Sequence, residues 1–281
     1  MGFIKSLLIC VKDKLFEIVR VHFPLLLRAY ILLRENGIRY VLGVIWNLLR
    51  SKCNTVKNIL FAKTFEKSYE AELTKLPLQS SVFLWTQEFG WSVPLFQRPQ
   101  HIARCMAEKD CTVFYYTSQY YDPDVTSIKM QYPNLYLVNR NNTVFIEMLD
   151  KYLEKVQVPK YIHIYSTNLE ISLDALREYE SKGYHVFYEY IDDLAPEISG
   201  TKEIPKHIQE KFDYVTWDDR IPMAVTADLL REQVLSMRGE RNLAFATNGV
   251  DVSHFRNMKG NFTFNEKFSS VLERQHKIVG Y

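Results

Sequence analysis

The stretch "SSVFLWTQEFGWSVPLFQRPQHIARCMAEKDCTVFYYTS" (residues 80 to 118) holds the pattern that decides the fold. Apolar, β-branched and aromatic residues at its two ends, 80 to 87 and 111 to 118, are typical of buried strands. Between them, residues 99 to 109 carry a helical pattern, and Pro99 suits the first turn of a helix. A strand, a helix and a second strand in this order predict two parallel strands joined by a crossover helix.

The same alternation continues almost to residue 249. Five more runs with strand character are "LYLVNR" (135 to 140), "KYIHIYST" (160 to 167), "HVFYEYID" (185 to 192), "YVTWDD" (214 to 219) and "LAFATNG" (243 to 249). Helical patterns occupy 143 to 156, 170 to 183, 205 to 213 and 222 to 237. We therefore predict an α/β fold with a doubly wound, mostly parallel, Rossmann-like sheet. Ligands of such sheets bind beyond the carboxyl ends of the strands.

The first 75 residues differ from this pattern and predict a basic, amphipathic, α-helical extension. Residues 1 to 57 contain ten Lys or Arg and three Asp or Glu, whereas the remainder of the chain carries 25 basic and 30 acidic residues. Apolar residues from Phe3 to His22 recur at three-four spacing, which is typical of an amphipathic helix. Two further apolar groups follow Pro24, and Asn36-Gly37 between them is a helix-stop signal.

Arg28, Arg34 and Arg39 interrupt every apolar run before it reaches the roughly 18 to 20 residues that a spanning helix needs. We therefore expect a protein at the inner face of a membrane, with residues 1 to 57 lying on an anionic surface. Docking on another protein, or packing on the rest of the chain, remains the alternative. Nucleic acid is not an expected partner, because no reading motif accompanies the basic residues.

The composition is that of an ordinary globular protein, with 47% hydrophobic residues. Cys10, Cys53, Cys105 and Cys111 form no CxxC pair and no spacing typical of metal ligands. They suit buried free thiols in a reducing compartment such as the cytoplasm. Neither a metal site nor a disulfide is expected.

The loop after the first strand offers the first candidate binding residues, Gly90, Trp91, Arg98 and His101. Glycine permits a close approach of the backbone that other residues resist. Arg98 and His101 lie around the amino terminus of the expected helix, which favours anions. Both side chains could equally brace the loop. No GxGxxG or Walker pattern is present, so a tightly bound dinucleotide or ATP is not expected.

Asp192 and Asp193 follow the fifth strand run and are the candidate catalytic residues. A carboxylate there could accept a proton or a hydrogen bond from a sugar hydroxyl. A helix-cap or turn role is the alternative, since Asp favours both. The segment "TNGVDVSHF" (247 to 255) supplies an Asn-Gly turn followed by an acidic residue.

Four segments in this order resemble the amino-terminal half of a glycosyltransferase with the two-Rossmann-domain, or GT-B, architecture. They are "PLFQRPQHIARCMAE", "YEYIDDL", "VTADLLREQV" and "ATNGVDVSHF". The resemblance is greatest to the family 4 type and its cell-surface polysaccharide enzymes, and it covers roughly residues 80 to 281. The amino-terminal domain would then span 76 to 275, and "HKIVGY" (276 to 281) would open the first strand of a carboxyl-terminal donor domain.

The resemblance implies transfer of a sugar from a UDP- or GDP-sugar co-substrate, with no tightly bound cofactor, to a glycan or lipid-linked acceptor. Gly90, Trp91, Arg98 and His101 would line the acceptor side of the interdomain cleft. Asp192 or Asp193 could serve an inverting enzyme as general base, and a retaining enzyme would need none. Asn248, Gly249 and Asp251 would form the interdomain turn.

The donor domain's nucleotide-binding residues have no positions in these 281 residues, so the chain by itself is expected to be inactive. Two other classes remain as alternatives. One is a non-catalytic half-enzyme that docks on a separate donor-domain chain or regulates a complete enzyme. The other is a different Rossmann-like enzyme, although no GxSxG motif or metal cluster supports it.

Overall fold

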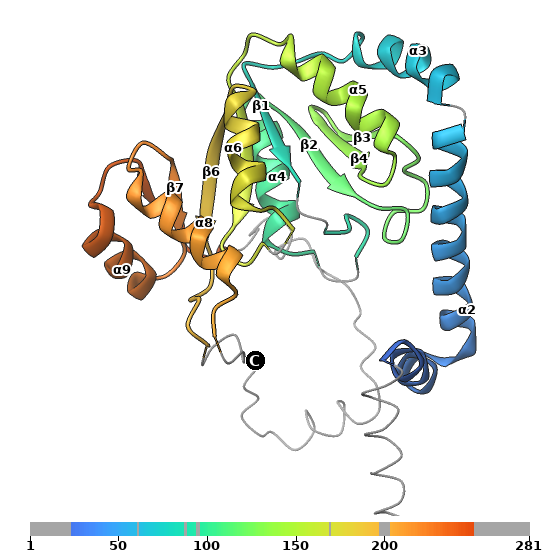
Figure 1. The fold of residues 1–281 in the computed structure, drawn as a ribbon, viewed down its shortest axis with the longest axis horizontal. Helices are drawn as coiled ribbons and strands as arrows, with labels where there is room; N and C mark the ends of the chain where they lie inside the picture. Colours follow the sequence, from blue (N-terminus) through green and yellow to red (C-terminus); the bar gives the residue numbers. More distant parts are fainter. Residues whose placement is uncertain are drawn as a thin grey trace, which may run out of the picture. The chain divides into compact units, whose positions relative to one another are not determined.

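A computed structural model describes residues 24–60, 62–86, 89–93, 96–168, 170–196 and 203–249. The chain divides into two compact units, Met1–Ala246 and Thr247–Tyr281. Every helix and strand described below belongs to the first unit (Figure 1).

The first unit is built on a sheet of eight strands in the order β3-β4-β2-β1-β5-β6-β7-β8. Neighbouring strands are parallel except for the antiparallel pair β3 and β4 at one edge. The strands are β1 (Ser81–Trp85), β2 (Cys111–Thr117), β3 (Ile128–Tyr132), β4 (Leu135–Asn139), β5 (Lys160–Tyr165), β6 (Tyr184–Tyr190), β7 (Met223–Val225) and β8 (Leu243–Phe245).

The strand order reverses direction between β1 and β5. From β1 the chain builds outward through β2 to β4, and it then returns to place β5 on the other side of β1. The remaining strands continue outward from β5. The predicted α/β fold with a doubly wound, mostly parallel sheet is therefore confirmed, and the point of reversal is where such sheets bind ligands.

Helices follow most strands, and four of the five predicted in this part of the chain lie close to their expected positions (Figure 1). The helices are α2 (Pro24–Leu60), α3 (Ala62–Leu73), α4 (Arg98–Glu108), α5 (Thr143–Glu154), α6 (Leu173–Ser181), α8 (Lys206–Trp217) and α9 (Asp228–Arg238). Local signals fix their starts. Asn142 and Ser172 cap α5 and α6 with side-chain oxygens, and Gln97 and Gln100 form a reciprocal capping box on α4.

The sheet separates two hydrophobic cores. Alternate residues of each strand face opposite sides, so Val82 and Leu84 belong to one core while Phe83 and Trp85 belong to the other. The first core is closed by apolar residues of α3, α5, α6, α8 and α9. The second core is smaller and contains Ala103 and Ala107 of α4.

The strand expected at 214 to 219 is wrong, because residues up to Trp217 continue helix α8. Ile208, Phe212 and Val215 recur at helical spacing and are buried together, so the short run "YVTW" belongs to a longer helical stripe. The strand that follows is β7, at the start of the segment predicted as a helix from 222. Strand β3 was not predicted, because its sequence "IKMQY" is polar and half-exposed at the sheet edge.

The amino-terminal helix predicted from Phe3 to His22 lies outside the described residues. Helix α2 is interrupted at Gly37, whose φ of 79° breaks the helical geometry, in agreement with the stop signal at Asn36-Gly37. Helix α3 packs on α5 and buries Tyr69 and Leu73 in the first core. Within the described part of the chain, no helix combines the length and apolar character needed to cross a membrane.

Candidate functional site

A buried ion pair joins the amino terminus of α4 to the carboxyl end of β6. Arg98 donates to Glu189 Oε1 from Nε at 2.8 Å and from Nη2 at 2.5 Å, and its Nη2 also donates to the carbonyl oxygen of Ala246 at 3.0 Å. Glu189 is 2% exposed and Arg98 is 20% exposed. One side chain therefore connects the start of α4, the end of β6 and the residue after β8 at the carboxyl edge of the sheet.

His163 of β5 completes this network. Its Nε2 lies 3.0 Å from Glu189 Oε2, and its side chain is fully buried. Burial lowers the pKa of His163, and this outweighs the opposing hydrogen bond and charge of Glu189. Burial alone would raise the pKa of Glu189, but His163 and Arg98 together hold it below its ordinary value. A neutral His163 therefore donates Nε2–H to an ionised Glu189.

Aromatic rings surround His163 on the α4 side of the sheet. The indole of Trp85 stacks on the imidazole with ring centroids 3.8 Å apart, and Tyr165 meets both rings edge-on. Among the described residues, Trp85 Nε1, His163 Nδ1 and the Tyr115 and Tyr165 hydroxyls are buried without a hydrogen-bond partner. The aromatic cluster on β1, β2 and β5 therefore contains buried polar ring nitrogens and hydroxyl groups.

Gly90 and Trp91 are held in the loop after β1 by a buried carboxylate. Asp122 accepts from the backbone N–H groups of Trp91 and Ser92 at 2.8 and 2.9 Å, and Thr117 donates its hydroxyl to the same carboxylate. The ring of Trp91 is 4% exposed and meets Tyr115 edge-on. The described structure therefore places Trp91 inside the second core, where its indole supports the loop.

Gly90 is also buried, and the reason for a glycine is visible. A Cβ at position 90 would lie 2.4 Å from Cβ of Tyr121, which is too close for any side chain. The carbonyl of Gly90 accepts from Gln100 Nε2 at 3.0 Å, which connects the loop to α4. The group that approaches the Gly90 backbone closely is thus the side chain of Tyr121.

His101 is half-buried on the first turn of α4, where its ring meets Phe96 edge-on at 4.7 Å. Like Arg98, it lies at the amino terminus of the helix. The structure therefore brings the four predicted binding residues to one end of the sheet, with Arg98 and Trp91 in bracing contacts.

Asp192 and Asp193 follow β6 at the same carboxyl edge, but their surroundings differ. Asp192 is exposed, and its backbone carbonyl accepts weakly from Ser166 Oγ, at 3.5 Å, next to the end of β5. Asp193 is half-buried, and its Oδ1 accepts from the backbone N–H of Ala195 at 3.0 Å in a turn. Of the pair, Asp192 is the carboxylate that faces solvent.

The residues predicted to form an interdomain turn lie in the second unit. Asn248 and Gly249 are exposed and follow β8. Asp251 lies outside the described residues.

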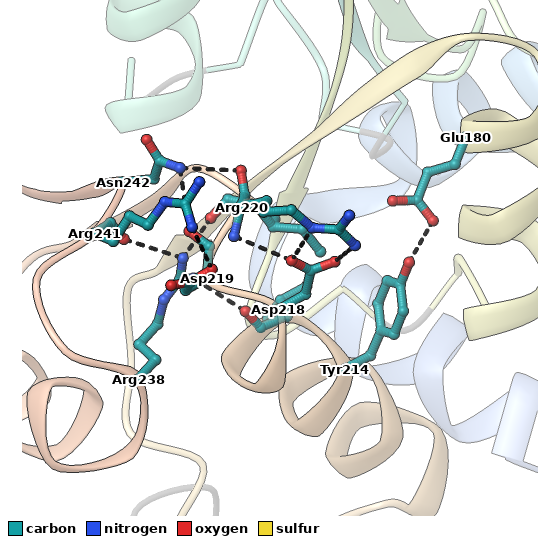
Figure 2. A network of polar contacts seen from close by, with 10 residues as sticks. Glu180, Tyr214, Asp218, Asp219, Arg220, Arg238, Arg241 and Asn242 are labelled. Carbon is teal, nitrogen blue, oxygen red and sulfur yellow. Dashed lines mark hydrogen bonds and ion pairs between the residues drawn. The ribbon is translucent and has the colours of Figure 1, made fainter.

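A second polar cluster, shown in Figure 2, lies at the amino ends of β7 and β8. Arg220 donates to both carboxylate oxygens of Asp218, at 2.8 and 2.6 Å, and its hydrogen bond lowers the pKa of Asp218 to about 2. Arg241 reaches Asp219 at 3.3 Å, and Arg238 donates to the backbone carbonyls of Val215 and Ile221. These contacts hold the two loops that precede the strands.

Two open hollows adjoin this cluster. One is lined by Arg177, Tyr214 and Trp217, and the other by Tyr184, His185 and Pro222, while Asp218 and Arg220 line both. The first hollow lies on α6 and α8 and the loop before β7, and the second lies at the amino ends of β6 and β7. Ligands of doubly wound sheets use the opposite, carboxyl edge of the strands. We therefore place the candidate site at the carboxyl edge.

Sequence reasoning missed His163, Glu189 and Asp122. A signal existed for the first two, because "YIHIY" and "VFYEY" each place a single His or Glu among apolar and aromatic residues of a strand. Such residues are rarely buried without a partner. Asp122 gave no signal, since it stands in a loop where Asp is ordinary.

Comparison with models of known protein families gives no match, and comparison with the sequences of curated proteins gives none either. Within the described ranges, no group of three or more His, Cys, Asp or Glu side chains is placed to hold a metal ion.

Proposed function

We propose that this chain is the acceptor-side domain of a GT-B glycosyltransferase that acts in cell-surface polysaccharide synthesis. It would hold a glycan or lipid-linked acceptor while a donor domain presents a UDP- or GDP-sugar. The observation that carries the proposal is the Arg98–Glu189 ion pair, because it fixes the amino terminus of α4 beside the loop that bears Asp192. Both elements lie at the carboxyl edge of the sheet, the edge at which doubly wound sheets bind ligands, and α4 follows β1, which borders the reversal of strand order.

The roles of the site residues divide according to their contacts. Arg98, Glu189 and His163 are tied to one another, so we assign them to positioning the α4 terminus and the end of β6. Trp91 and Gly90 shape the loop between β1 and α4. Asp192 remains exposed at the carboxyl edge and is the candidate to touch the acceptor.

In an inverting reaction, Asp192 would accept the proton of the acceptor hydroxyl while that oxygen attacks the anomeric carbon of the donor. The bond from that carbon to the diphosphate oxygen breaks, and the nucleotide diphosphate leaves with the bonding electrons. A positioned general base contributes about 10²- to 10⁴-fold to a rate. Asp193 is less suited to this task because it already accepts a turn hydrogen bond.

The test is a sugar-transfer assay on the chain joined to, or mixed with, a GT-B donor domain. We expect Asp192→Asn to lower kcat by about 10²-fold or more, with a smaller change in KM, as for loss of a general base. Asp174→Asn is the control, since that side chain is 95% exposed on α6. Transfer by Asp192→Asn at the original rate would remove Asp192 from this role, and absence of any transfer would contradict the proposed function.

A further inference from the structure

Helix α2 carries a line of large apolar side chains that are open to solvent. After Gly37, positions 38, 42, 45, 49 and 56 follow the three-four spacing that places side chains along one face. Their exposed fractions are 64% for Ile38, 58% for Leu42, 47% for Ile45, 54% for Leu49 and 56% for Val56. Trp46, which is 67% exposed, lies beside this line. We call these six residues the α2 stripe.

A different face of α2 packs on the rest of the first unit. Val41, Val44 and Asn47 are half-buried, and α2 contacts α5. Asn54 donates to Gln119 Oε1 at 2.7 Å. The α2 stripe is therefore additional to the face that attaches the helix, and a contiguous exposed apolar surface of this kind marks an interaction site.

The charges beside the α2 stripe are all positive. Arg39, Arg50 and Lys57 are exposed and lie about three and two helical turns apart, so they form a row along the Trp46 side. The sequence has no Asp or Glu between Glu35 and Glu66. A second copy of the chain would bring two such rows together, and like charges would repel. The face therefore suits an apolar partner with negative charge.

We propose that the exposed face of α2 lies flat on an anionic lipid surface, with the α2 stripe in the outer part of the acyl layer. Trp46 would sit at the headgroup level and the basic row would contact lipid phosphates, as in interfacial amphipathic helices. This inference concerns where the protein works and does not depend on glycosyl transfer.

The first test measures binding of the full chain to vesicles of phosphatidylcholine, with and without about a third of phosphatidylglycerol. The variant Ile45→Gln/Trp46→Gln/Leu49→Gln is expected to weaken binding to the anionic vesicles by about ten-fold or more, because it removes buried apolar area. The control is Trp217→Gln/Leu229→Gln, which removes side chains that are 82% and 78% exposed on α8 and α9. It should bind as the original chain does.

The second test addresses the charge. Arg39→Gln/Arg50→Gln/Lys57→Gln is expected to weaken binding roughly 100-fold, at about a five-fold loss for each basic residue near the surface. Lys109→Gln/Lys151→Gln/Lys155→Gln removes the same charge from exposed positions on other elements and is the matched control. Residues 1 to 23 are identical in every variant, so a difference between the two triple variants reports on α2 itself.

The third test places Trp46 directly. Lipids brominated on the acyl chain should quench the fluorescence that Trp46→Phe removes, whereas an aqueous quencher should lose access to it when vesicles are added. Binding to anionic vesicles that neither α2 variant weakens would overturn the proposal. Self-association that Ile45→Gln/Trp46→Gln/Leu49→Gln abolishes, without vesicle binding by the original chain, would overturn it in favour of a second copy.

Discussion

At the residue scale, Glu189 is the side chain on which the site depends. It is buried at the end of β6, and its two carboxylate oxygens are shared between Arg98 and His163. A buried carboxylate is stable only where its partners replace the lost water. Replacement of any one of the three residues would therefore leave a buried polar or charged group of another without a partner.

Arg98→Met is expected to lower the free energy of unfolding by about 3 kcal/mol, because it leaves a buried charge with one partner fewer. Urea unfolding of Arg98→Met, Glu189→Gln and the double variant measures the coupling as a double-mutant cycle. The control is Arg140→Met, which breaks a half-exposed pair with Glu170 and should cost less than about 1 kcal/mol. Equal costs for the two arginines would contradict the bracing role.

The lowered pKa of His163 predicts how the free energy of unfolding depends on pH. Because the pKa of His163 in the folded chain lies below the ordinary value of about 6.5, the unfolded chain binds a proton at this residue before the folded chain does as the pH falls. The stability that His163 contributes is therefore complete above about 6.5 and is lost as pH falls, by at most about 1.4 kcal/mol per pH unit. The difference in unfolding free energy between the original chain and His163→Gln should shrink from pH 7 to pH 5. A constant difference would contradict the pKa direction.

At the element scale, helix starts are secured by caps of unequal strength. Asn142 accepts from Phe145 N at 3.1 Å at the start of α5, and its Nδ2 also donates to the Tyr69 hydroxyl and the Thr126 carbonyl. It thereby connects α5 to α3. The Ser172 hydroxyl at the start of α6 accepts the capping bond from Ala175 N, and among the described residues it has no other hydrogen bond. Ser172 thus stabilises only the start of its own helix, whereas Asn142 also holds α5 against other parts of the fold.

Asn142→Ala should accordingly destabilise more than Ser172→Ala. The serine cap is worth about 1 kcal/mol, whereas loss of Asn142 also leaves buried polar groups unpaired, at roughly 1 to 3 kcal/mol more. Thermal and urea unfolding of the two variants provide the comparison. A larger effect at Ser172 would show that Asn142 is not the link between α3 and α5.

Substitution of glycine by alanine is expected to change the free energy of unfolding in opposite directions at Gly90 and Gly43. Gly90→Ala would push a Cβ against Tyr121 in a buried loop and should destabilise by about 1 to 3 kcal/mol. Gly43 lies inside α2 with nothing within 4 Å of an added Cβ, so Gly43→Ala should stabilise by up to about 1 kcal/mol. Matched unfolding curves test both, and stabilisation by Gly90→Ala would contradict the described loop packing.

At the scale of the whole molecule, the sequence predicted the fold more completely than the site. Five of the strands, β1, β2, β4, β5 and β6, appear as apolar runs because parallel strands inside a sheet are buried on both faces. The run at 243 to 249 also predicted β8, a three-residue edge strand that is mostly exposed. The polar edge strand β3 and the three-residue β7 lack that signal, and "YVTW" carried a signal that a helix shares. Local pattern cannot distinguish a short strand from one turn of a buried helical stripe.

The site was predicted only in outline, because its geometry depends on contacts between distant residues. Arg98 and Glu189 are 91 positions apart, and no local spacing relates them. The edge of the sheet could be predicted from strand order, and the candidate residues after the first and fifth runs do lie there. Which of the two carboxylates faces solvent follows from the structure, in which Asp192 is exposed and Asp193 is half-buried with a turn hydrogen bond.

The central claim is that the carboxyl edge of this sheet binds a sugar acceptor, and hydrogen exchange on the chain with and without candidate glycans tests it most directly. The account predicts that acceptor glycans slow exchange in 86 to 98 and 189 to 194, around Arg98 and Asp192, without any nucleotide. Protection by nucleotide sugars alone, or protection by glycans confined to the opposite edge around Asp218 and Arg220, would contradict it.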